Sequence, residues 1–341
     1  AALATIASRA KVTVIYPELE EKLKALCADN QADSEEKKRV ALWMQSMART
    51  LAAEGNLTEA MALADGNMPE GMVNMQAGDF ALAMQVKSNG VKVRSLFDLQ
   101  QSLELNAVER ALPLFEIDLS SSTSENNMSL NSSEGWEKVT ATSEDGLHVT
   151  FYGLTNTIAV QVCCQPIPSQ SGCNWKIDIN SGSSDWNVEN VRFPQVAVRR
   201  LGEEATALVP IGPGQMRPDA GKVAFSYDGR YPSGWCSMPI MGVFQESNGL
   251  GLYYAVHDEW GSTRQLMLES EPGMECIRMV FETPVPDMGK TKEYSFCGEG
   301  VWQLVRGGWF DAAMIYKQWA REHARWWPAL GAEGREDTAL W

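Results

Sequence analysis

Apolar residues recur every three or four positions along residues 1–70, which is the spacing of one face of an α-helix. The apolar positions of the first predicted helix are Leu19, Leu23 and Leu26, and those of the second are Val40, Met44, Met47 and Leu51. Asp33 is the expected N-cap of the second helix, and Gly55 follows its end. Residues 1–74 are therefore predicted to form a helical N-terminal segment. We expect residues 1–70 to dock on the sandwich rather than fold alone, because one helical repeat unit is too small to be stable by itself.

After Met75 the apolar residues alternate with polar ones, which indicates strands with one buried face. Short turn signals separate successive runs, namely Asn89-Gly90, Asp145-Gly146 and Asn248-Gly249. About a dozen such runs follow one another with almost no helical pattern between them, as in antiparallel sandwiches. Residues 75–305 are therefore predicted to be mainly β, a large antiparallel sandwich. The Ser- and Asn-rich stretch 120–133 is predicted to be a surface loop.

Helical spacing returns over residues 306–341. Gly307-Gly308 precedes a stripe of apolar and aromatic positions, and Pro328 is predicted to end the helix. Asp311 in its first turn and Arg325 near its end suit the helix dipole. The pattern predicts a linking helix and the beginning of a further domain.

The chain carries 44 acidic and 29 basic residues, which gives a formal net charge of −15. This balance argues against nucleic acid or an anionic membrane surface as a partner, because both require a basic face. No apolar run approaches the roughly 20 residues of a membrane span. The chain begins Ala1-Ala2-Leu3 without an initiator Met, which suits a processed product. A secreted or otherwise extracytoplasmic location, with the export signal removed, is therefore expected.

Common catalytic and cofactor signatures are missing from the sequence. It holds no glycine-rich phosphate loop, His-Glu-x-x-His or Gly-x-Ser-x-Gly motif. With 3 His, and 7 Cys that show no metal-ligand spacing, neither a metal nor a cofactor is expected. Pairs of carboxylates can always be drawn from 44 acidic residues, so no catalytic residue is assigned.

One segment groups side chains that suit a sugar. The most apolar strand of the chain ends in His257 and Asp258, Trp260 and Arg264 follow closely, and Trp235 precedes the hairpin. Together these substrate-binding candidates supply an acceptor, a donor and an aromatic face, and they are expected to lie close together at one edge. The alternative interpretation is structural. In it Asp258 caps the turn, Trp260 packs in the core, and Arg264 pairs with a carboxylate.

Several short motifs follow one another in a set order. They are Phe193-Pro194-Gln195, Val209-Pro210-Ile211-Gly212-Pro213-Gly214, Tyr231-Pro232, Ser237-Met238-Pro239-Ile240, Gly251-Leu252-Tyr253 and His257-Asp258. In this order they resemble the N-terminal β-supersandwich of a bacterial glycoside-hydrolase family, the endo-α-N-acetylgalactosaminidase group. The ending from Gly308-Trp309-Phe310-Asp311 to Trp326-Trp327 resembles the helix that links sandwich to barrel there. Met238-Pro239 departs from the Met-Gln of that pattern. The resemblance covers roughly residues 75–341 and leaves out the helices of residues 1–70.

The resemblance implies a galactose-mutarotase-like supersandwich whose catalytic carboxylates lie on a following (β/α)8 barrel. The first hypothesis is therefore the non-catalytic sandwich portion of a carbohydrate-active enzyme, a glycoside hydrolase. Its expected partners are a carbohydrate and a C-terminal catalytic barrel of the same protein, and residues 1–341 alone are expected to hydrolyse no glycoside. The competing hypothesis is a free-standing glycan-binding or scaffolding β-sandwich protein. The two differ in whether the coding sequence continues past Trp341.

Overall fold

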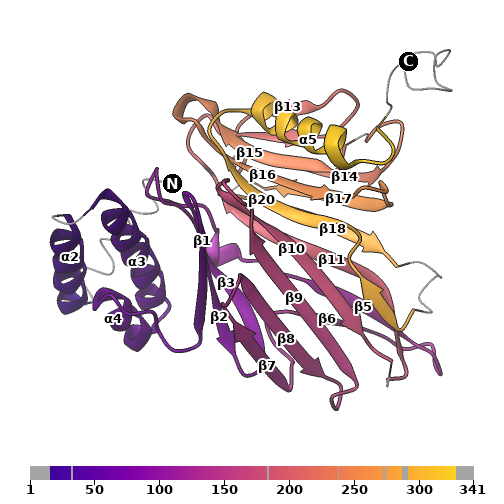
Figure 1. The fold of residues 1–341 in the computed structure, drawn as a ribbon, viewed down its shortest axis with the longest axis horizontal. Helices are drawn as coiled ribbons and strands as arrows, with labels where there is room; N and C mark the ends of the chain where they lie inside the picture. Colours follow the sequence, from indigo (N-terminus) through magenta and orange to yellow (C-terminus); the bar gives the residue numbers. More distant parts are fainter. Residues whose placement is uncertain are drawn as a thin grey trace.

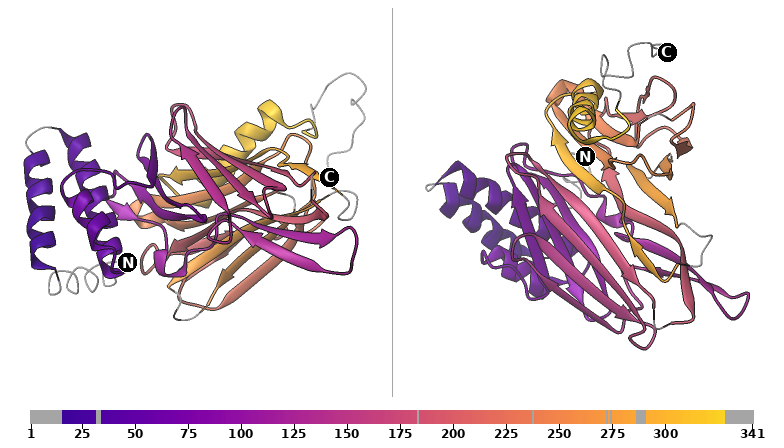
Figure 2. Two further views of the ribbon diagram at one scale, coloured as in Figure 1. Left: turned by 90° about the horizontal axis from the view of Figure 1, so that it is seen from below. Right: turned by 45° about the vertical axis from the view of Figure 1, so that its right-hand side comes forward.

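The computed structural model describes residues 16–31, 34–182, 184–236, 238–271, 273, 275–285 and 291–327. Its strands form three sheets in which every pair of neighbours is antiparallel, and a layer of helices covers the N-terminal end (Figures 1 and 2). The predicted mainly β architecture, a large antiparallel sandwich, is confirmed.

The N-terminal layer contains α2 (Pro17–Gln31), α3 (Glu35–Ala53) and α4 (Leu57–Ala64). Ser34 is the N-cap of α3, because its hydroxyl accepts a hydrogen bond from the backbone N–H of Lys37 at 3.2 Å. The cap therefore falls one residue after Asp33, which lies outside the described residues. Helix α3 ends at Ala53, close to the predicted stop at Gly55.

These helices pack on one face of a four-stranded sheet. Its order is β1 (Met72–Ala77), β2 (Phe80–Lys87), β3 (Gly90–Asp98) and β4 (Leu103–Glu104). Leu51 and Leu63 of the helices share a buried cluster with Ala81 and Phe97 of the sheet. A polar link crosses the same interface, because the indole N–H of Trp43 donates to the hydroxyl of Ser95 at 2.8 Å. The predicted docking of the helical segment is therefore what the packing shows.

A peptide of residues 1–70 is expected to show no cooperative thermal unfolding. Part of the apolar face of its helices is buried only against the four-stranded sheet, so the isolated peptide would expose that face to water. Circular dichroism during heating measures this directly, with a fragment of residues 1–105 that adds the sheet as the comparison. A sharp melting transition in the short peptide would contradict the prediction.

Two larger sheets face each other and form the sandwich. The first has the order β13 (Gln215–Arg217), β12 (Thr206–Val209), β15 (Ile240–Gln245), β16 (Leu250–His257), β20 (Glu299–Val305), β10 (Gly172–Asn180), β9 (Ile158–Pro166), β8 (Leu147–Gly153) and β7 (Lys138–Thr142), with β19 (Glu293–Ser295) paired to β10. The second has the order β14 (Phe225–Tyr231), β17 (Arg264–Ser270), β18 (Cys276–Pro284), β11 (Trp186–Arg199), β5 (Glu116–Ser121) and β6 (Asn127–Asn131). Short 3-10 turns cover Val108–Arg110 and Glu246–Asn248.

Large side chains from the inner faces of both sheets fill the core. The rings of Trp175 and Trp302, on β10 and β20, are 4.9 Å apart, and Phe193 of the facing sheet meets Trp175 edge-on at 6.3 Å. Every residue of β16 from Leu250 to Val256 is buried, as the apolar run predicts. This strand lies in the middle of the larger sheet and leads directly to His257.

The stretch 120–133 is not the loop that its composition suggests. It contains β6, which pairs with β5 so that Ile117 lies opposite Leu130 and Leu119 opposite Met128. Strand β6 lies at the edge of its sheet, where polar side chains face water and protect the edge from further pairing. An edge strand of this kind has a loop-like composition, which explains the wrong prediction.

The last described helix, α5 (Trp309–His323), lies across β15 and β16 (Figure 1). The backbone N–H of Gly308 donates to the carboxylate of Asp311 at 2.9 Å and so closes the first turn. The helix ends at His323, before the predicted stop at Pro328, and the backbone N–H of Arg325 donates to the carbonyl of Glu259 at 3.0 Å. No helix among the described residues is long and apolar enough to cross a membrane.

Candidate functional site

A buried ion pair joins the end of β16 to the beginning of β17. Asp258 and Arg264 are 2% and 0% exposed, and their charged atoms are 2.9 Å apart. The Asp258 carboxylate also accepts the backbone N–H of Trp260 at 2.9 Å and that of Ser262 at 2.8 Å. The pair therefore fixes the turn between the two strands, which is the structural role that the alternative interpretation assigned to these two residues.

The Arg264 guanidinium has further partners within the protein. It donates to the hydroxyl of Thr283 at 3.0 Å and to the carbonyl of Cys297, and it lies 4.8 Å from the ring centre of Phe296. Burial opposes ionisation of the Asp258 carboxyl, but the Arg264 charge and the turn hydrogen bonds outweigh it and hold the pKa below its usual range. Asp258 and Arg264 are therefore positioning residues, because their ion pair holds the turn between β16 and β17 in place.

His257 is packed between two aromatic side chains. Its Nε2 lies 2.9 Å from the hydroxyl of Tyr253, and its ring stacks on Trp319 of α5 at 4.6 Å. Burial, and after it the nearby His323, lowers the pKa of His257 to about 3. The imidazole is therefore neutral near pH 7, and it can take part in hydrogen bonds without carrying a charge.

Trp260 and Trp235 are the most exposed tryptophans of the described chain, at 64% and 77%. The guanidinium of Arg325 lies over the Trp260 ring at 4.1 Å and pairs with Glu259 at 3.3 Å. Packing of Trp260 in the core, the alternative to sugar contact, is therefore wrong. Trp235 lies in the turn closed by Ser233 and, like Arg264, lines neither of the two cavities described below.

A groove of about 830 Å³ lies between α5, the ends of β10 and β20, and the loop that follows β16. His257, Asp258 and Trp260 line it, together with Trp319 and His323 of α5. Three of the five predicted site residues thus meet at one cavity. Polar side chains of β10 and β20 complete its wall, and the sequence alone did not single them out.

Glu299 of β20 is the centre of this polar wall. Its carboxylate accepts a hydrogen bond from the side-chain amide of Asn174 at 2.6 Å and pairs with the ammonium of Lys176 at 3.0 Å. Asn174 and Lys176 alternate with buried residues along β10, so the alternation of polar and apolar residues in the sequence predicts that they face outward. Their partner is 125 residues away from Asn174 in sequence, and no local signal links the two strands.

This arrangement suits a polyhydroxylated ligand. An ammonium, a carboxylate, an amide and a neutral imidazole supply donors and acceptors, and tryptophan rings offer apolar faces to the C–H groups of a sugar. Among the described residues, no group of three or more His, Cys, Asp or Glu side chains is placed to hold a metal ion. The seven cysteines, all within the described part of the chain, form no disulfide bond.

Similar proteins are found both by sequence and by structure. No model of a known protein family matches the chain. Over 182 residues, 51% of this chain, it is 26% identical to a protein of Monosiga brevicollis named "Putative glycoside hydrolase 22789", and it spans 13% of that protein's length. The α-N-acetylgalactosaminidase NagBb from Bifidobacterium bifidum, solved with GalNAc, matches 74% of this chain and 39% of its own, with a TM-score of 0.51 and 12% identity. The chain is thus a mainly β, antiparallel sandwich, and it has a glycoside-hydrolase-like relative.

Proposed function

We propose that this chain is a non-catalytic, glycan-binding sandwich region of a carbohydrate-active protein, with the groove beside α5 as its sugar site. The observation that carries the proposal is the Lys176–Glu299–Asn174 constellation, in a cavity that Trp260 and Trp319 also line. A glycoside-hydrolase-like relative and the fold of a glycosidase sandwich support the same class. Asp258 and Arg264 hold the turn that carries Trp260, and the ring of His257 stacks on the ring of Trp319.

The proposal includes a further domain that packs against the C-terminal side of the sandwich. Helix α5 turns large apolar side chains to water: Phe310 is 60% exposed, and Trp309 and Met314 are also exposed. Such a face is typical of an interface between domains, and it favours a sandwich packed on a barrel over a free-standing protein. The secreted location and the bacterial origin remain proposals. Reading the parent gene past Trp341 tests the barrel, since roughly 300 further residues with alternating β and α periods are expected.

Replacing Glu299 with glutamine is expected to weaken binding of a neutral sugar about tenfold, because hydrogen bonds to a charged group are the strong ones. D-galactose and N-acetyl-D-galactosamine serve as probes, titrated into the whole chain. The groove is lined by Ile167 and Ile315, so ¹³C-labelled isoleucine methyl groups report binding there by nuclear magnetic resonance.

Glu269→Gln is the matched control for this variant. Glu269 also lies on a strand in a partly exposed ion pair, 3.2 Å from Arg278, but it does not line the groove. Its replacement is expected to leave the methyl titration unchanged. Equal affinities of the Glu299→Gln and unmodified proteins, or no response of the two isoleucines to either sugar, would refute the proposed site.

A further inference from the structure

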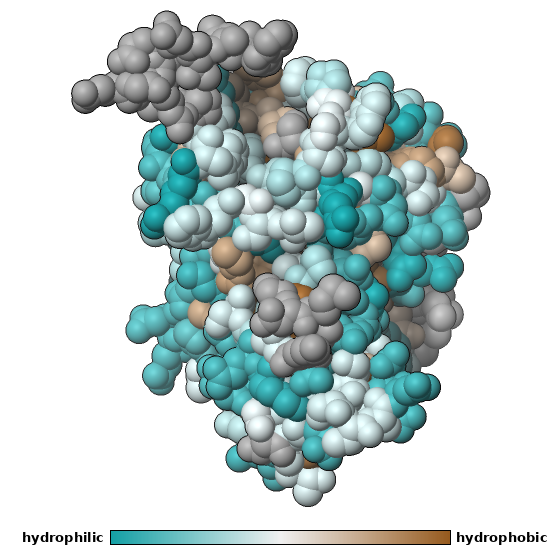
Figure 3. Space-filling view, turned by 90° about the vertical axis from the view of Figure 1, so that its right-hand side faces the viewer, coloured by the Kyte–Doolittle hydropathy of each residue, from teal (hydrophilic) through white to brown (hydrophobic). Residues whose placement is uncertain are grey.

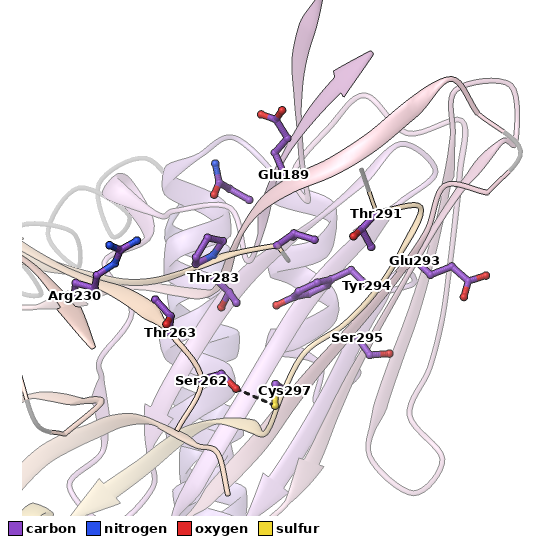
Figure 4. Close-up of a pocket in the computed structure, with 13 residues that line it drawn as sticks. Glu189, Arg230, Ser262, Thr263, Thr283, Thr291, Glu293, Tyr294, Ser295 and Cys297 are labelled. Atoms are coloured by element: carbon purple, nitrogen blue, oxygen red, sulfur yellow. Dashed lines mark hydrogen bonds between the residues drawn. The ribbon is translucent and has the colours of Figure 1, made fainter. Parts of the chain in front are cut away.

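A second cavity, here called the end cleft, opens where β11, β14, β18 and β19 approach one another. Its volume of about 970 Å³ falls in the range of small-molecule sites. Hydroxyl side chains make up much of its lining, namely Ser262, Thr263, Thr283, Thr291 and Tyr294 (Figure 4). The surface of the molecule on the right-hand side of Figure 1 is mostly hydrophilic, with small hydrophobic areas between polar ones (Figure 3).

Tyr294 is the most informative of these residues. It is 7% exposed, and its hydroxyl has no hydrogen-bond partner within 3.5 Å among the described residues. Figure 4 shows the hydroxyl directed toward Thr283, whose own hydroxyl accepts from Arg264 at 3.0 Å. A buried hydroxyl without a partner is costly, so this group is placed to bond something that enters the cleft. Burial raises the pKa of Tyr294 to about 12, so the phenol keeps its proton and can donate it.

Arg230 supplies a charged donor at the edge of the end cleft. Within the described ranges it takes part in no ion pair, although it lies on a strand of a sheet whose other arginines are paired. In Figure 4 its side chain stands on the opposite side of the cleft from Tyr294, and the side chains of Glu293 and Ser295 point away from that ring. A guanidinium fork and a phenol on opposite walls can reach two hydroxyl groups of one ligand.

We propose that the end cleft binds a neutral polyhydroxylated ligand, a hexose unit, at a second site separate from the groove beside α5. Hydroxyl groups both donate and accept, so a wall of Ser, Thr and Tyr side chains matches the hydroxyls of a sugar. An anionic ligand is disfavoured, because Glu189 also lines the cleft and the chain carries a net charge of −15. This inference goes beyond the proposed function and does not depend on it.

The two cavities are neighbours with a shared wall. Ser295 and Cys297 line both of them, and the Asp258–Arg264 pair lies beside that wall, since Arg264 donates to the carbonyl of Cys297 and to Thr283. The hydroxyl of Ser262 donates to the thiol of Cys297 at 3.3 Å, as Figure 4 shows. The rest of each lining is separate, so a sugar in the end cleft and one in the groove share at most Ser295 and Cys297 as contacts.

Threonine methyl groups report on the end cleft alone. Thr263, Thr283 and Thr291 line it, whereas Ile167 and Ile315 line the groove, so one chain with both residue types ¹³C-labelled separates the two sites. The whole chain is titrated with D-galactose, and in parallel with galacturonate as the anionic probe and spermidine as the cationic one. We expect D-galactose to shift the three threonine signals along a saturable curve, and the two charged probes to leave them in place.

Tyr294→Phe is the decisive variant. It removes the unpaired hydroxyl and keeps the ring, so the melting temperature is expected to stay the same or rise, while the affinity reported by the threonine signals falls about fivefold. Arg230→Met is expected to weaken the same titration. Tyr152→Phe is the matched control, because Tyr152 lies on β8 and lines neither cavity.

The outcomes separate this inference from the proposed function. Saturable threonine shifts that Tyr294→Phe weakens support the end cleft, whether or not the isoleucines respond. Isoleucine shifts without threonine shifts would overturn the inference and leave the groove standing. Threonine shifts that only galacturonate or only spermidine produces, or an affinity that Tyr294→Phe does not change, would overturn it as well.

Discussion

Replacement of Arg264 by methionine is expected to lower the free energy of unfolding by about 3–5 kcal/mol, which is the usual cost of removing one partner of a buried ion pair. Arg264 is completely buried, and its removal leaves the Asp258 carboxylate without its counter-charge, 2% exposed at the end of β16. The carbonyl of Cys297 and the hydroxyl of Thr283 lose a donor at the same time. Urea unfolding followed by tryptophan fluorescence measures the change.

Arg278→Met is the control for this prediction. Arg278 lies on the neighbouring strand β18 in an exposed ion pair with Glu269, and its loss is expected to cost less than about 1 kcal/mol. The double variant Asp258→Asn, Arg264→Met is expected to recover part of the stability, because it removes the unpaired charge. Equal losses for Arg264→Met and Arg278→Met would show that the buried pair has no special role.

The Arg264 variant also has a predicted pH dependence. The pKa of Asp258 is held below its usual range, so ionisation of this group stabilises the folded chain above the ordinary aspartate pKa. That contribution is lost as the pH falls through the lowered value. Without Arg264 the carboxyl is expected to become easier to protonate, and the stabilisation it gives near pH 7 should disappear.

Glu104→Gln is expected to change the pH dependence of stability by up to about 3 kcal/mol, the equivalent of a shift of two to three pKa units. Burial raises the pKa of Glu104 to about 7 from an ordinary 4.5, although Ser95 and two backbone N–H groups donate to its carboxylate. The folded chain therefore binds this proton more tightly than the unfolded chain does. Stability contributed by the protonated form is complete below about pH 4.5 and is lost as the pH rises to about 7.

Glutamine cannot ionise, and its amide can keep the same neighbours: the oxygen accepts the two backbone N–H groups and the nitrogen donates to Ser95. The Glu104→Gln protein is therefore expected to lack the decline between about pH 4.5 and 7 that is expected of the unmodified chain. Unfolding free energies at four pH values across this range test it, with Glu269→Gln as the control at a partly exposed carboxylate. Parallel pH profiles for all three proteins would contradict the prediction.

Local pattern was sufficient for the fold class and for much of the strand arrangement. The hairpin of β2 and β3 turns at Asn89-Gly90, and that of β15 and β16 turns near Asn248-Gly249, where Gly249 takes the positive φ of 57° that favours glycine. Strand β6 was missed for the opposite reason. At the edge of a sheet a strand can be polar on most positions, and then its composition no longer differs from that of a loop.

The candidate site was only partly predictable. His257, Asp258, Trp260 and Arg264 are close in sequence and at the end of one apolar strand, so their proximity followed from local order. Local order did not show which of these four side chains faces water and which faces the core. Asp258 and Arg264 turned out to be buried together, and Trp260 to be exposed beside the groove, since burial depends on which strands and helices cover the position.

The sequence by itself determined the periods of its segments, the acidic balance and the positions of its tight turns, because these depend on residues a few positions apart. Only the tertiary structure decided that Glu299 meets Lys176, that Trp319 of α5 covers His257, and that the Tyr294 hydroxyl faces a cavity without a partner. Each of these contacts joins segments that are distant along the chain or on different sheets. Their register is set by how two large sheets and a helix pack as a whole, and no local pattern carries that information.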